Sequence, residues 1–241
     1  NFCKVLCSYI NGSIRMVRLI SYSQPAKEFA EKNPELKTVQ DLIAHAARVS
    51  NPANQKNVDT SERLLKYLMK HAHWSPFEMA SACMEITTTR DIARQILRHR
   101  SFSFQEFSQR YADPHESLSY VMREPRMQDP KNRQNSIDEC PSDIRKSWAR
   151  HQMAVREAAQ EAYKWATDNG IAKEQARAVL PEGLVESRIY MNGTLRSWLH
   201  YVELRSAHGT QKEHQEIARK CGDILVSILP MMESFIHGKE G

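Results

Sequence analysis

The stretch RHRSFSFQEFSQR, residues 98–110, says more about this chain than any other segment of similar length. It opens with three cation-capable side chains, Arg98, His99 and Arg100, and it closes with Arg110. Three rings lie between them: Phe102, Phe104 and Phe107. Guanidinium groups bind phosphate in a bidentate manner and aromatic rings stack on bases. The stretch therefore predicts a site for a nucleotide.

Working outward, a helix is predicted before this stretch, at residues 90–99, and extended chain after it. In extended chain, alternate residues share a face, so Glu106, Ser108 and Arg110 would lie together. They would offer an acceptor, a hydroxyl group and a fork-shaped donor, which a ribose and a phosphate both need.

The remaining elements follow from hydrophobic periodicity and from capping residues. Strands are predicted at 16–22, 78–88 and 189–193. Further helices are predicted at 38–48, 60–72, 143–169, 172–180, 194–206 and 210–229. Because few strands alternate with many helices, the predicted class is α/β (α+β) and helix-rich.

The predicted domain organisation is a single catalytic domain at 16–235. The polar residues 112–145 are expected to form an insert, as a long loop or lid. Residues 1–15 precede the strand that opens at Met16, so we expect them to be an N-terminal extension, disordered or not native.

The composition narrows the class of protein. The 241 residues carry a net charge of +5, which suits anionic ligands without the dense basic pattern of an obligate nucleic-acid binder. The five cysteines are odd in number and form no CxxC pair, and His71 and His73 have no third ligand at a suitable spacing. We therefore expect no metal site and no disulfide framework. With no apolar run long enough to span a membrane, a cytoplasmic location is expected.

Three arginines recur along the helix before the opening stretch, at Arg90, Arg94 and Arg98. Like charges at i,i+4 destabilise an isolated helix by roughly 0.2–0.5 kcal/mol per pair. Either a bound anion removes this penalty, or the face is solvated with Asp91 as a partial partner.

The predicted helix at 194–206 carries polar residues on two sides. Its core face follows an i, i+3, i+4, i+7 pattern from Leu195 to Val202. Arg196 and His200 share another face, whereas Arg205 points about opposite to Arg196 at 100° per residue. Two ligands, or sites of two subunits, could use both faces; ordinary surface charge is the alternative. Arg177, one turn after Glu174, has a simple surface ion pair as its alternative.

These motifs together resemble the flavin-dependent thymidylate synthases. The pattern RHR-x7-S at 98–108 is accompanied, in order along the chain, by AARVS at 46–50, HWSPFE at 73–78, ARQ at 93–95 and LRSWLHYVELR at 195–205. The resemblance runs from about residue 16 to residue 230. It implies a central, largely antiparallel sheet flanked by helices, and a homotetramer that shares its sites between subunits.

The resemblance also implies an activity and its residues. Members convert dUMP to dTMP with methylenetetrahydrofolate as carbon donor and with NADPH as hydride source through FAD. By position, the FAD contacts are Ser50, Arg98, His99, Arg100, Glu106, Arg196 and His200. The dUMP contacts are Gln95, Arg98, Glu106, Phe107, Ser108, Gln109, Arg110, Arg177 and Arg205.

Single roles follow for two residues. Arg205 matches the catalytic residue that stabilises negative charge on uracil N3, and His73 matches the folate and nicotinamide region. His200 stands where some members have Asn, which alters its flavin contact chemically.

Two other functions stay open at this stage. One is a basic module that binds single-stranded nucleic acid through the cations and rings of residues 90–110. The other is a family fold without activity, which the intact set of arginines disfavours. For the enzyme, neither nucleic acid nor membrane is an expected partner.

Overall fold

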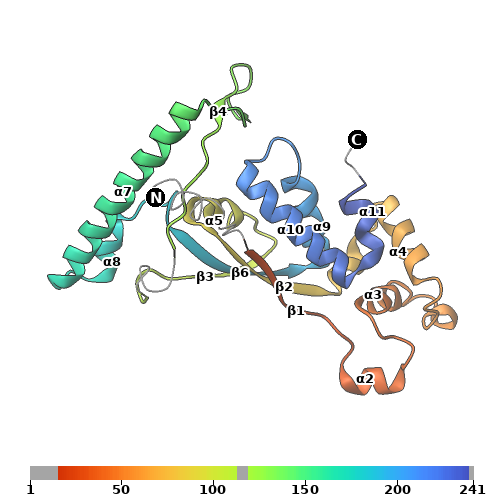
Figure 1. The fold of residues 1–241 in the computed structure, drawn as a ribbon. Coiled ribbons are helices and arrows are strands. Elements are labelled where there is room, and N and C mark those ends of the chain that lie inside the picture. Colours follow the sequence, from red (N-terminus) through yellow and green to blue (C-terminus); the bar gives the residue numbers. More distant parts are fainter. Residues whose placement is uncertain (1–15, 113–118, 239–241) are drawn as a thin grey trace.

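The computed structural model describes residues 16–112 and 119–238 (Figure 1). The strands are β1 (Met16–Tyr22), β2 (Ser81–Thr89), β3 (Ser103–Glu106), β4 (Met127–Gln128), β5 (Ser136–Ile137) and β6 (Glu186–Thr194). The helices are α2 (Lys27–Lys32), α3 (Val39–Ala47), α4 (Ser61–Lys70), α5 (Arg90–Ile96), α7 (Ser142–Asp168), α8 (Lys173–Ala176), α9 (Leu195–Arg205), α10 (Lys212–Ile228) and α11 (Glu233–Ile236). Short 3-10 turns are η1 (Pro52–Asn54), η2 (Ser75–Glu78), η3 (Arg177–Val179) and η4 (Pro230–Met232).

Four strands form one antiparallel sheet in the order β1-β2-β6-β3. Its centre is the β2–β6 pair, which runs without interruption from Ser81 opposite Thr194 to Thr89 opposite Glu186. The predicted class, a largely antiparallel sheet with many helices, is confirmed. Sequence reasoning missed β3 as a strand of this sheet.

Helices α5, α9 and α10 lie together over one face of the sheet (Figure 1). The core forms where they meet β2 and β6, around side chains such as Met84, Met191 and Trp198, which are 0% exposed. The indole of Trp198 also donates a hydrogen bond to the carbonyl oxygen of Ala82, over 2.9 Å. Helix α9 is thus held to β2 by burial and by a satisfied polar contact.

Both central strands lead into a helix without an intervening loop. Strand β2 ends at Thr89 and α5 begins at Arg90, while β6 ends at Thr194 and α9 begins at Leu195. The hydroxyl oxygen of Thr194 accepts the backbone N–H of Ser197, over 3.2 Å, as an N-cap. The sheet therefore sets the position of both helices.

Helices α7 and α8 lie at the other end of the molecule, away from α3 and α4 (Figure 1). A second, smaller core joins them to the chain before β6 through Tyr163, Ala176 and Val185. Helix α7 ends at Asp168 with Asn169 as C-cap, and Gly170 follows with a φ of 77°, the left-handed conformation that commonly closes a helix.

Several predictions about single segments need correction. Within the predicted insert, the described residues 119–145 contain the β4–β5 hairpin and the start of α7, so this part is more ordered than a loop. The predicted helix at 172–180 ends after one turn and continues as the 3-10 turn η3. The predicted helix at 60–72 is the shorter α4, whose N-cap residue Thr60 makes no side-chain cap hydrogen bond; its hydroxyl oxygen accepts from the guanidinium of Arg48, over 2.7 Å. The predicted extension, residues 1–15, lies outside the described residues.

Candidate active site

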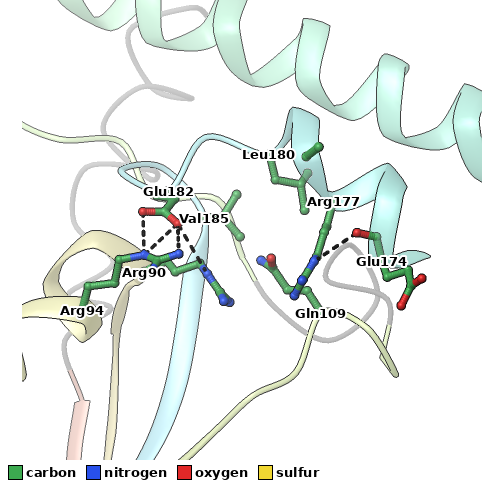
Figure 2. A pocket seen from close by; sticks show the side chains of 9 residues that line it. Arg90, Arg94, Gln109, Glu174, Arg177, Leu180, Glu182 and Val185 are labelled. Atoms are coloured by element: carbon green, nitrogen blue, oxygen red, sulfur yellow. Dashed lines mark hydrogen bonds and ion pairs between the residues drawn. The ribbon is translucent and has the colours of Figure 1, made fainter. Parts of the chain in front are cut away.

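A pocket of about 430 Å³ lies between α5, the segment before β6, and the α8–η3 turn (Figure 2). Its lining is rich in arginine and polar groups. The residues are Arg90, Arg94, Gln109, Glu174, Arg177, Ala178, Leu180, Glu182 and Val185. Two of the predicted dUMP contacts, Gln109 and Arg177, therefore line the same pocket.

Glu182 supplies the counter-charge for the arginine face of α5. The Arg94 guanidinium donates from Nε to both carboxylate oxygens of Glu182, over 2.8 Å each, and Arg90 approaches the same group at 3.9 Å. Asp91 pairs instead with Arg123 at 2.5 Å, so Asp91 is not the partner of this face. Glu182 was not predicted, since no periodic pattern marks it.

Two buried donors in this pocket have no hydrogen-bond partner in the described chain. They are Nε2 of Gln109, a residue that is 3% exposed, and Nη1 of Arg90. The nearest carboxylate to that Arg90 nitrogen, that of Glu106, is 3.7 Å away. A buried donor left unpaired costs about 1–3 kcal/mol, so both favour an acceptor in the pocket.

The predicted extended face of Glu106, Ser108 and Arg110 is wrong. Strand β3 ends at Glu106, and the carbonyl oxygen of Ser108 accepts the N–H groups of Tyr111 and Ala112, which closes a turn. Glu106 stays in the sheet layer, where its carboxylate accepts from the Ser187 hydroxyl over 2.8 Å. The turn brings Gln109 into the pocket wall, which an extended chain would not have done.

Arg110 and Arg177 meet at Glu174 rather than forming the expected surface pair. Arg110 contacts the Glu174 carboxylate at 3.3 Å, and Arg177 donates from Nε to the Glu174 carbonyl oxygen over 3.3 Å. The charged end of Arg177 is thus left without a carboxylate partner within the described chain. Figure 2 shows Arg177 and Arg90 reaching toward Gln109 from opposite walls.

A second group joins the end of α5 to the end of α9. Arg205 donates from Nε to Nε2 of His99, over 2.9 Å. Burial, followed by the charges of Arg205 and Arg98, lowers the pKa of His99 to about 4. A neutral His99 with an unprotonated Nε2 is therefore the acceptor that holds Arg205. Gln95, a turn before His99, faces the buried His214, which sequence reasoning missed.

A third group lies at the start of α9. Arg196 pairs with Glu78 of η2, and the exposed ring of His200 meets Trp74 edge to face at 4.8 Å between centroids. His73, immediately before Trp74, is exposed, and so is Ser50 in the turn after α3. Arg196 and Arg205 thus serve different groups, as the opposite faces of the helix predict.

The remaining predicted residues lie around these groups. Arg98 and Arg100 are exposed, and neither has an ion-pair partner in the described chain. Phe102 is buried against Trp198 and Phe104 packs on the same core, so neither ring is free to stack on a base. The Phe107 backbone N–H donates to the Arg188 carbonyl oxygen over 2.8 Å, which anchors the chain as it leaves β3.

Within residues 16–112 and 119–238, no three His, Cys, Asp or Glu side chains gather as a metal site. In that same part of the chain, no helix is both long and apolar enough to cross a bilayer.

The fold is an antiparallel sheet covered by helices that carry separate groups of arginines, which is a mixed α/β class, and comparison with known proteins names the family. The family model described as "Thymidylate synthase complementing protein" (Thy1) matches residues 34–231, and the chain belongs to this family. It is accordingly an enzyme, a flavin-dependent thymidylate synthase.

Individual relatives agree over most of the chain. The "Probable flavin-dependent thymidylate synthase" of Paramecium bursaria Chlorella virus 1 is 47% identical over 88% of this chain and 94% of its own. The flavin-dependent thymidylate synthase of Synechocystis sp. is 46% identical over 92% of this chain and 99% of its own. The crystal structure of the UMP/dUMP methylase PolB from Streptomyces cacaoi, bound with 5-Br dUMP, aligns with a TM-score of 0.74. It is 25% identical, and the alignment covers 90% of this chain and 92% of that one.

Proposed function

We propose that this enzyme binds dUMP between the arginine pocket of one copy and the Gln95–His99–Arg205 group of another, and methylates it to dTMP. The observation that carries the proposal is the pair of unpartnered buried donors, Gln109 Nε2 and Arg90 Nη1, beside the free end of Arg177. A phosphate or a uracil carbonyl has the acceptors that these donors lack. Ser108 is a ligand in this proposal, since no hydrogen bond joins its hydroxyl to a general base among residues 16–112 and 119–238.

Arg205 has the catalytic role. Uracil C5 is a weak nucleophile, and negative charge spread over N3 and O4 raises its electron density. The Nε of Arg205 is used by His99, so its two terminal nitrogens remain for the base. A fixed guanidinium stabilises such charge without giving up a proton, and the half-buried position of Arg205 strengthens the effect.

The cofactor FAD fits the cations that the chain leaves unpaired. Arg98 and Arg100 are exposed and lack carboxylate partners in the described chain, which suits the phosphates of a dinucleotide. Glu106, Arg196, His200 and Ser50 complete the proposed FAD contacts. When bound, FAD supplies the hydride, taken from NADPH, that reduces the methylene group to methyl. His73 borders the region for folate and nicotinamide.

We also propose a homotetramer with shared sites, formed from one catalytic domain per chain, in the cytoplasm. Helix α7 exposes the apolar side chains of Val155 and Trp165, and the 3-10 turn η3 exposes Val179. An apolar hollow lined by Ala162, Ile171 and Val179 lies at this face. Apolar surface of this extent is typical of subunit interfaces. A second copy at this face would bring another set of groups to the α8–η3 pocket.

An absorption spectrum tests the proposal directly. The purified protein should be yellow, NADPH should bleach the flavin band, and methylenetetrahydrofolate with dUMP should yield dTMP. A colourless protein that takes up no FAD would contradict the proposal.

A further inference from the structure

A hydrogen-bonded chain of buried and half-buried polar side chains connects Gln95 to the β4–β5 hairpin of the insert. It starts at Arg126, just before β4, whose two terminal nitrogens donate to the Glu213 carboxylate over 2.7 and 2.8 Å. Gln211 donates to Glu213 over 2.9 Å, and Gln95 donates to Gln211 over 2.8 Å. None of these hydrogen-bonded side chains is needed to explain the fold of the sheet.

The chain continues beyond Gln95 into the core. The Gln95 carbonyl oxygen lies 3.3 Å from Nδ1 of His214, and Nε2 of His214 lies 3.1 Å from the Tyr201 hydroxyl. His214 is 0% exposed and Tyr201 is 1% exposed. Burial, followed by the charges of Arg205 and His99, lowers the pKa of His214 to about 3, so its ring is neutral.

The charge of Glu213 sets the direction of every hydrogen bond in this chain. Burial alone would raise the pKa of Glu213, but the hydrogen bonds and charge of Arg126 lower the pKa to about 2. An ionised carboxylate only accepts, so Gln211 must turn its amide nitrogen toward it. Gln211 then presents its amide oxygen to Gln95, and Gln95 must donate a hydrogen bond to it from its own amide nitrogen.

The same logic fixes the histidine tautomer. With its nitrogen toward Gln211, Gln95 shows His214 an oxygen, which only accepts. A neutral imidazole has one N–H, so this proton sits on Nδ1 and Nε2 accepts from Tyr201. Burial raises the pKa of Tyr201, which keeps the phenol proton in place.

We infer that Gln211, Glu213 and His214 are positioning residues that hold the Gln95 amide in one orientation, with one Nε2 hydrogen left for an oxygen of the nucleotide. This inference rests on the proposed function, in which Gln95 contacts dUMP. Gln95 is half-buried, so the remaining N–H has access to a ligand. Without the Glu213 carboxylate, the side-chain amides of Gln211 and Gln95 could both flip. Gln95 would then present its oxygen to the nucleotide as often as its N–H.

The test interrupts this series of hydrogen bonds at its middle residue, Gln211. In Gln211→Leu, the Arg126–Glu213 ion pair stays intact, but no side chain at position 211 fixes the orientation of the Gln95 amide. The KM for dUMP should rise about tenfold, as expected for the loss of one good hydrogen bond, while kcat and flavin content stay within about twofold. Lys212→Ala is the matched control, because Lys212 joins the same helix to Asp138 near the hairpin through an exposed ion pair at 2.8 Å. That change should leave the KM for dUMP unaltered.

A double substitution separates positioning from general damage. In a Gln95→Leu background, adding Gln211→Leu should not raise the KM further, because the group that it orients is gone. An equal rise in both backgrounds, or a KM within twofold of the native value for Gln211→Leu alone, would overturn the inference. His214→Asn, which keeps a donor near the Nδ1 position, should have a lower KM than His214→Leu, and the reverse order also counts against it.

The failure of this inference can be told apart from the failure of the proposed function. If the native enzyme binds no FAD or makes no dTMP, the proposed function is wrong. If the native enzyme turns over and Gln211→Leu matches it, only the positioning role is wrong. Should Gln211→Leu fail to fold, Glu213→Gln is measured in the same two backgrounds with the same expected tenfold change.

Discussion

Arg205 is held by His99 through Nε alone, at 2.9 Å, which leaves both terminal nitrogens of its guanidinium free of hydrogen bonds to the described chain. His99 therefore orients the guanidinium of Arg205 without neutralising its positive charge. Because His99 is a neutral acceptor with a pKa of about 4, the pair persists at physiological pH.

Replacing Arg205 by Ala should abolish dTMP formation without removing the flavin. The expected loss in kcat is roughly 10²–10³-fold, the usual cost of removing one donor to developing charge. The measurement is dTMP yield against the flavin absorbance of the same sample. If the Arg205→Ala protein purifies without FAD, the residue holds the cofactor and the assigned role is wrong.

Sites shared between copies can be tested by complementation. Arg177→Ala and Arg205→Ala proteins should each be inactive alone, since each lacks one wall of every site. Hybrid oligomers, made by co-expression with two affinity tags, should regain part of the native activity because some sites then receive both arginines. Hybrids as inactive as their parents would mean that one copy supplies both residues.

Acid should destabilise the protein between pH 7 and 5 because of its buried histidines. The ordinary pKa of 6.5 falls to about 4 for His99 and about 3 for His214 in the fold. The unfolded chain therefore binds more protons in this range, and stability that is full above pH 6.5 is lost as pH falls. Each histidine contributes a slope of up to about 1.4 kcal/mol per pH unit.

The pH effect can be assigned to one residue by substitution. His214→Gln takes no proton, so its unfolding free energy, measured by urea titration, should depend less steeply on pH between 7 and 5. Glu213 does not interfere, because its contribution is lost only as pH falls below 4.5 toward 2. An unchanged slope in His214→Gln would show that other groups cause the acid sensitivity.

Gly193 in β6 should tolerate no larger residue. A Cβ there would lie 2.7 Å from Cε1 of Phe102, whose ring is wedged against Trp198. Gly193→Ala should therefore lower the unfolding free energy by about 1–3 kcal/mol, as overpacking does. The control Gly209→Ala, with nothing within 4 Å of its Cβ, should not share this steric cost.

A smaller neighbour should relieve the crowding at Gly193. In a Phe102→Leu background, Gly193→Ala should cost less than in the native background, by urea or thermal unfolding. Equal costs in both backgrounds would place the strain elsewhere in the strand.

Sequence reasoning found the longer helices and the strands β1, β2 and β6 because their apolar spacing is regular, but it missed the short helices α2 and α11. It missed β3 and mistook residues 107–110 for extended chain, since the turn at Ser108 is set by backbone hydrogen bonds that leave no periodic mark. The hairpin β4–β5 was missed for a similar reason, because two-residue strands show no alternation.

The sequence predicted a set of candidate residues but not how they are arranged in the fold. Local motifs identify Arg177 and Arg205, yet they do not tell that one chain keeps them in separate groups. Glu182 and His214 were not among the predicted residues, because each acts through a partner distant in sequence, Arg94 and Gln95 respectively. Such long-range pairs become visible only when the chain is folded.

The direct junctions of Thr89 with Arg90 and of Thr194 with Leu195 make this fold sensitive to length rather than to composition. One extra residue at either junction would turn the whole following helix by about 100° and move it by about 1.5 Å. Gln95 would leave Gln211, or Arg205 would leave His99, although no functional side chain had changed. Viable insertions in relatives should therefore avoid both junctions and gather in segments such as 112–145.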